Sequence, residues 1–150
     1  MTTKDKIAQF LSDIEAGREF FREGVSQVEA GNYAAGITAL QEALRRSPNF
    51  PQAYAWLGYA CLERALKAEP AWAAEFFDQA LESAGQALDF ELCPQNACAL
   101  AHCVLGLVHL KAYNDRNYAL KKYELVRQLN QKFARLLKDR INQNPLSQTP

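Results

Sequence analysis

The sequence predicts an all-α fold built from stacked pairs of short antiparallel helices. Residues that favour helices, chiefly Ala, Leu, Glu, Gln, Lys and Arg, are common among the 150 residues, whereas Gly and Pro number only 7 and 6. Two amphipathic segments, 18–30 and 33–46, are joined by the turn residues Gly31 and Asn32. This arrangement is typical of a helix–turn–helix unit.

Small residues recur along this unit at Gly24, Gly36 and Ala43, with large apolar residues between them. Small residues let two helix backbones approach closely, and the large ones fill the gaps that remain. A unit of this kind leaves apolar surface on its outer side, so we expect it to stack on further units.

Signals at the ends of the second segment set its limits. Asn32 is expected to cap the helix, with its side chain accepting from an N–H of the first turn. Pro48 lacks an N–H and disfavours the helical conformation at Ser47, so we expect the helix to end there.

A further helix is predicted over residues 3–16, ahead of this unit. Its apolar residues follow the i, i+3, i+4, i+7 spacing of one helix face, and they are Ile7, Phe10, Leu11 and Ile14. Gly17 either breaks this helix or only weakens it before the next one begins.

From Gly17 onward the chain resembles the tetratricopeptide repeat family, whose unit is 34 residues long. The matching residues of the first unit are Phe20, Gly24, Gly31, Tyr33, Gly36, Leu40, Ala43 and Pro48. Glu23 departs from the pattern, since the family has Leu there. The second unit is similar at Tyr54, Leu57 and Gly58, and the third at Leu105 and Gly106.

The resemblance implies a right-handed α-solenoid of about three antiparallel helix pairs, with an N-terminal helix and a long C-terminal capping helix. We expect one domain, 1–143, with units at approximately 17–50, 51–98 and 99–132, a cap at 133–143 and a disordered tail at 144–150. The second unit carries about 14 extra residues. Apolar spacing from Ala119 to Ile141 predicts that one helix of about 25 residues merges the last repeat helix with the cap.

The sequence offers little catalytic chemistry. It has no glycine-rich phosphate loop, no G-x-S-x-G and no H-E-x-x-H. Cys98 and His102 share a helix face at i, i+4, but Cys93, Cys103 and His109 do not complete the paired spacing of a zinc site. We therefore expect no enzymatic activity, no metal and no cofactor. Without a C-x-x-C pair, the four cysteines are expected to be free thiols in a reducing compartment.

Charge and hydropathy suggest a location and exclude some partners. No apolar run approaches the roughly 20 residues of a membrane span, and no signal peptide is recognisable, so we expect a cytoplasmic protein without membrane insertion. Residues 1–110 carry a net charge of −6, and residues 111–150 carry +6. The basic C-terminal residues alternate with an apolar stripe, which is typical of the solvated face of a docked helix and does not indicate nucleic acid.

The resemblance further implies a concave groove lined by the first helix of each unit. The residues at its lining positions are Arg18, Phe21, Arg22, Val25, Gln52, Trp56, Tyr59, Leu62, Cys103, Leu107 and Lys111. Only Arg18 and Arg22 resemble the basic residues with which some members clamp a carboxylate, so we do not expect such a clamp. An apolar groove needs a cover, which a partner protein, a helix of the same chain or a second copy could supply.

These observations favour a non-catalytic scaffold, adaptor or assembly factor that binds an apolar or amphipathic segment of a partner protein. Two alternatives stay open. One is a secretion chaperone, since small three-repeat members of the family protect exported proteins. The other is a homo-oligomeric structural protein whose acidic body meets the basic C-terminal helix of a neighbour.

Overall fold

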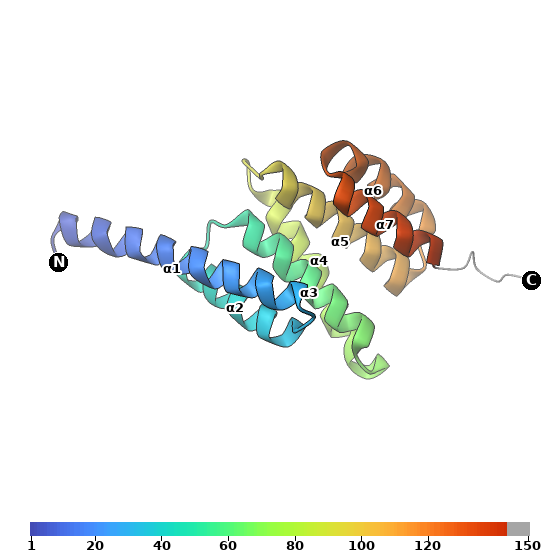
Figure 1. Ribbon diagram of the computed structural model, residues 1–150, viewed down its shortest axis with the longest axis horizontal. Helices are drawn as coiled ribbons and strands as arrows, with labels where there is room; N and C mark the ends of the chain where they lie inside the picture. The colour runs from blue at the N-terminus through green and yellow to red at the C-terminus, as the bar shows by residue number, and fades with distance from the viewer. Residues whose placement is uncertain (144–150) are drawn as a thin grey trace, which may run out of the picture.

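The chain folds into seven helices across residues 1–143, the part described by the computed structural model; the predicted disordered tail, 144–150, lies outside the described residues. The helices are α1 (Thr3–Glu29), α2 (Tyr33–Arg46), α3 (Pro51–Lys67), α4 (Pro70–Asp89), α5 (Gln95–Tyr113), α6 (Arg116–Leu129) and α7 (Gln131–Gln143). They pack sequentially in antiparallel pairs (Figure 1). This confirms the all-α array. None of the described helices has the length and hydropathy to cross a membrane.

Helix α1 is one continuous helix of 27 residues, so Gly17 does not break it. Thr2 and Asp5 form a capping box at its start. A Cβ atom at Gly17 would lie 2.9 Å from the Ser47 side chain and 3.3 Å from the Ala43 carbonyl oxygen. Gly17 is therefore required by the close approach of the end of α2.

The same close packing explains the other small residues of the first helix pair. A Cβ atom at Gly24 would lie 2.7 Å from the Leu40 side chain, and one at Gly36 would lie 2.5 Å from the Val28 side chain. The chain reverses between α1 and α2 at Gly31, whose φ of +86° favours glycine.

The limits of α2 agree only in part with the sequence signals. The helix ends at Arg46 and Ser47 leaves the helical region, as Pro48 predicts. Asn32 occupies the predicted N-cap position, but the predicted side-chain contact is wrong, because its side chain makes no capping hydrogen bond. The Asn32 amide instead donates to Gln27 Oε1 at 2.9 Å, back across the turn.

The prediction of one long C-terminal helix is also wrong, because Asn130 divides it into α6 and α7. The backbone of Asn130 is extended, with φ −159° and ψ 114°. Its Oδ1 accepts from the N–H of Phe133 at 3.0 Å, which caps the start of α7. Its Nδ2 donates to Oδ1 of Asn96 at 3.0 Å, which ties this corner to the start of α5.

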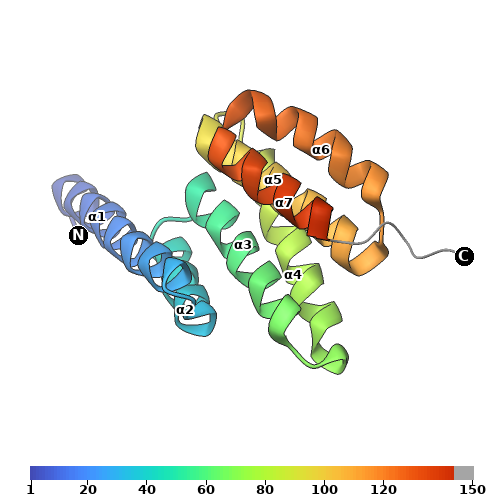
Figure 2. The ribbon, with the colours of Figure 1, turned by 45° about the vertical axis from the view of Figure 1, so that its right-hand side comes forward.

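The buried core is one cluster with residues from each of the seven helices. Its largest fully buried side chains include Leu62 of α3, Leu100, Leu107 and Leu110 of α5, and Leu137 and Ile141 of α7. Figure 2 shows α7 lying over α5 and beside α6, while the N-terminal half of α1 extends away from this core. Helix α7 thus turns back onto α5.

Candidate partner-binding surface

The predicted groove residues of α1 lie on the surface. Arg18 and Arg22 are exposed, and Phe21 and Val25 are half-buried. A pocket of about 330 Å³ on this face is lined by Phe21, Arg22, Val25, Ser26 and Glu29. The ring of Phe21 lies 4.8 Å from that of Phe50, the residue that precedes α3, so this face adjoins the start of the second unit.

The predicted residues of α3 are half-buried, except Leu62. Gln52, Trp56 and Tyr59 keep part of their surface, whereas Leu62 is completely buried. The Trp56 ring makes edge contacts with two other rings, that of Tyr59 at 6.0 Å and that of Phe133 on α7 at 6.5 Å. Part of the Trp56 side chain is therefore covered by contacts within the chain.

The predicted residues of α5 lie mostly beneath α7. Cys103 and Leu107 have no exposed surface, and only Lys111 is partly exposed. The Cys103 thiol donates to the Phe133 carbonyl oxygen at 3.7 Å. The chain's own C-terminal helix thus packs on α5 and covers Cys103. Leu62, Cys103 and Leu107 are core residues and are not accessible to a partner.

An ion pair that was not predicted from the sequence joins α7 to α3. Arg140 of α7 donates to Oε1 of Glu63 on α3 at 2.7 Å, and Glu63 is only 6% exposed. The available signal was Glu63 itself, a lone acid among the apolar residues of its helix, but nothing in the sequence identified its partner.

The ion pair lies within a polar cluster that spans four helices, α2, α3, α5 and α7. Burial, reinforced by the Glu63 carboxylate, raises the pKa of Tyr59, and the same two causes raise the pKa of Tyr33 at the start of α2. Burial and the charge of Arg140 lower the pKa of Lys111. Both phenols therefore stay protonated at neutral pH, beside the Glu63 carboxylate.

The thiols and the imidazole are poorly suited to nucleophilic chemistry. Burial raises the pKa of Cys61 to about 11 and that of Cys103 to about 12, so little thiolate exists at neutral pH. Burial, followed by the Lys122 charge, lowers the pKa of His102 to about 4, and its Nδ1 lies 3.1 Å from Lys122 Nζ. Among residues 1–143, no three His, Cys, Asp or Glu side chains are grouped as metal ligands would be.

The accessible remainder of the predicted groove is an apolar and aromatic surface with a basic edge. On α1 and α3 it consists of Arg18, Phe21, Arg22, Val25, Gln52, Trp56 and Tyr59. Such a surface can bind by burying side chains and by donating hydrogen bonds. We call it the α1–α3 surface.

Comparison with known proteins identifies the repeat. Residues 21–69, from the second half of α1 to the end of the α3–α4 connection, match the family model of the tetratricopeptide repeat. This confirms the resemblance where the sequence pattern is strongest. Comparisons with curated proteins and with solved structures found no match.

Proposed function

We propose that this chain, an all-helical array with a tetratricopeptide repeat at residues 21–69, is a non-catalytic scaffold that binds a partner protein on the α1–α3 surface. Tetratricopeptide repeats generally mediate protein–protein interactions. The bound segment would be apolar or amphipathic, and would lay its apolar side chains against Phe21, Val25 and Trp56.

The observation that carries the proposal is the half-exposed aromatic surface of α3 beside the α1 pocket. Trp and Tyr supply much of the energy of protein interfaces, and Trp56 and Tyr59 are both partly exposed. Arg18 and Arg22, which are exposed at the edge, would favour acidic residues on the polar side of the bound segment.

The proposal includes no catalytic role and no cofactor. The raised pKa values of Cys61 and Cys103 support this, since neither thiol is activated. We place the protein in the cytoplasm as part of the same proposal, because all four cysteines are free.

The test is affinity capture from the native cell followed by mass spectrometry, with three versions of the full chain. Trp56→Ala with Tyr59→Ala should lose the captured protein, and Arg22→Glu with Val25→Glu should lose the same protein. Trp72→Ala is the matched aromatic control, because Trp72 is 62% exposed on α4, away from this surface. Circular dichroism should show unchanged helicity in each. Full capture by the folded double variants would refute the proposal.

A further inference from the structure

The N-terminal part of α1, residues 3–16, leaves three large apolar side chains in solvent. We call this segment the arm. Ile7 is 55% exposed, Phe10 63% and Leu11 58%. Figure 1 shows the arm extending beyond the other helices. Three large apolar side chains on one face of a projecting helix form a surface that favours association.

The exposed face continues the stripe by which α1 packs against α2. Gly17, Gly24 and Val28 of that stripe are buried under α2, and Phe10 and Ile14 extend it at the alternating spacing of three and four residues found in coiled coils. Helix α2 ends at Arg46, beside Gly17. The arm therefore has the apolar pattern of a packed helix, but α2, which ends beside Gly17, does not extend along it.

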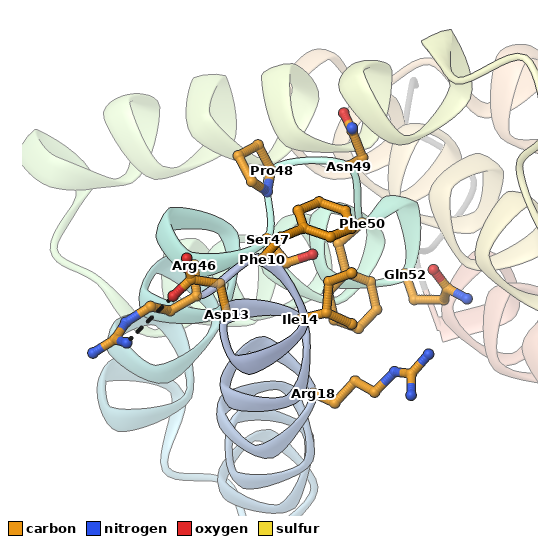
Figure 3. Close-up of a pocket in the computed structure, with 10 residues that line it drawn as sticks. All are labelled: Phe10, Asp13, Ile14, Arg18, Arg46, Ser47, Pro48, Asn49, Phe50 and Gln52. Atoms are coloured by element: carbon orange, nitrogen blue, oxygen red, sulfur yellow. Dashed lines mark ion pairs between the residues drawn. The ribbon is translucent and has the colours of Figure 1, made fainter. Parts of the chain in front are cut away.

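A cavity of about 430 Å³ lies where the arm joins the body. It is lined by Phe10, Asp13, Ile14 and Arg18 of α1, by Arg46 at the end of α2, by the connection 47–50 and by Gln52 (Figure 3). A helix lying along the arm would reach this cavity with one of its ends.

We propose that the arm pairs, antiparallel, with the arm of a second copy of this chain. Helix α2 is antiparallel to α1, so an antiparallel second arm would continue the line of α2 along the same face. With Phe10 near its centre, the pair would place Thr3 of the second copy at the level of Gly17, where α2 ends. The cavity would receive the first turn of that helix.

The charges on the arm select the antiparallel direction. At 3.6 residues per turn, Lys4 and Glu15 lie on one side of the apolar face, and Lys6 and Asp13 lie on the other. In antiparallel packing the same side of each helix meets its copy, with the residue order reversed. Each Lys4 then meets a Glu15, and each Lys6 meets an Asp13, which also pairs with Arg46 of its own chain at 3.8 Å. Parallel packing would instead bring Lys4 beside Lys6 and Glu15 beside Asp13, which is repulsive.

The charges of Lys4 and Glu15 are available for this role. Both side chains are exposed, and neither forms an ion pair within residues 1–143. Two arms bury less area than a typical stable interface, so we expect a dimer that dissociates on dilution through the micromolar range.

The test is sedimentation velocity of the full chain over a concentration series. Lys4→Glu alone and Glu15→Lys alone should each weaken the dimer about tenfold, because each creates two repulsive contacts. An equimolar mixture of these two variants should regain the wild-type affinity, since both contacts are then attractive. The double variant Lys4→Glu, Glu15→Lys should regain it as well.

Two further variants test the apolar contact. Phe10→Asp should give a monomer, whereas Ser12→Asp, on the opposite side of the arm, should leave the dimer intact. Circular dichroism checks that each variant keeps its helix. A wild-type chain that stays monomeric, a dimer insensitive to Phe10→Asp, or a dimer tightened by Lys4→Glu would each overturn the proposal. Trp56→Ala with Tyr59→Ala should not change the dimer, which separates this test from that of the α1–α3 surface.

Discussion

Arg140 Nη2 lies 2.7 Å from Glu63 Oε1, and these two residues are 77 positions apart in the chain. The pair joins α7 to α3, although α7 packs chiefly on α5 and α6. The Glu63 side chain is 7% exposed and that of Arg140 is 21% exposed. The C-terminal helix is thus held over the middle of the array by a charge contact as well as by Leu137 and Ile141.

Arg140→Gln should destabilise the protein by about 3 kcal/mol, because it leaves the Glu63 carboxylate buried without its cation. Urea unfolding measures the loss. Glu63→Gln combined with Arg140→Gln should cost less than Arg140→Gln alone. The matched control is Arg127→Gln, which breaks the exposed pair with Glu124 and should cost under about 0.5 kcal/mol. Equal losses in Arg140→Gln and Arg127→Gln would contradict the role of the buried pair.

Gly36→Ala should destabilise the protein by about 2 kcal/mol, because the new Cβ would lie 2.5 Å from Val28 and 3.1 Å from the carbonyl oxygen of Gly24. Gly85→Ala is the control within α4, where a Cβ would meet nothing within 4 Å. It should stabilise the protein by about 0.5–1 kcal/mol, since Ala favours the helix. Thermal unfolding of both variants checks the sign of each change.

Stability should fall as the pH drops from about 6.5 towards 4, partly through His102, whose pKa is lowered from 6.5 to about 4 in the folded chain. The unfolded chain takes up this proton first, so acid favours unfolding over that range. Because the ring is only half-buried, we expect a contribution of about 1 kcal/mol between roughly pH 7 and pH 5. Denaturant titrations at the two pH values should show a correspondingly smaller loss in His102→Gln. An identical loss in both proteins would show that His102 does not contribute.

Phe133→Ala should expose Trp56, because the two rings are in edge contact at 6.5 Å. In a Trp72→Phe background Trp56 is the only tryptophan, so its emission should shift to longer wavelength. Leu125→Ala is the control, since Leu125 is 37% exposed on α6. Unchanged emission in Phe133→Ala would mean that α7 does not shield this ring.

The sequence was most informative where local rules and packing agree. Gly24 and Gly36 were predicted to allow close helix contact, and Pro48 was predicted to end α2; all three predictions are confirmed. The repeat match over residues 21–69 covers this same region. Sequence patterns were sufficient here because Pro48 acts on the residue before it, and because Gly24 and Gly36 lie between two helices that are consecutive in the chain.

The sequence was less informative where distant segments decide the outcome. The apolar spacing from Ala119 to Ile141 is continuous, and only the contacts of Asn130 with Phe133 and Asn96 explain the break. Asn is a favoured cap residue, so Asn130 was an available signal. The burial of Cys103 could not be predicted from its position in a repeat, because it depends on the contact with Phe133 of α7, 30 residues further along the chain.

The unbroken α1 has a consequence for binding geometry. The helix carries the apolar arm and the pocket around Phe21 on one rigid element, without a flexible joint at Gly17. From residue 10 to Phe21 the rise is about 17 Å. Two chains joined through their arms would therefore hold their α1–α3 surfaces at a fixed separation. A target with two suitably spaced segments would bind both α1–α3 surfaces. Once its first segment is bound, the second would bind at a high effective concentration. The separation of the two surfaces would therefore select targets whose segments have the matching spacing.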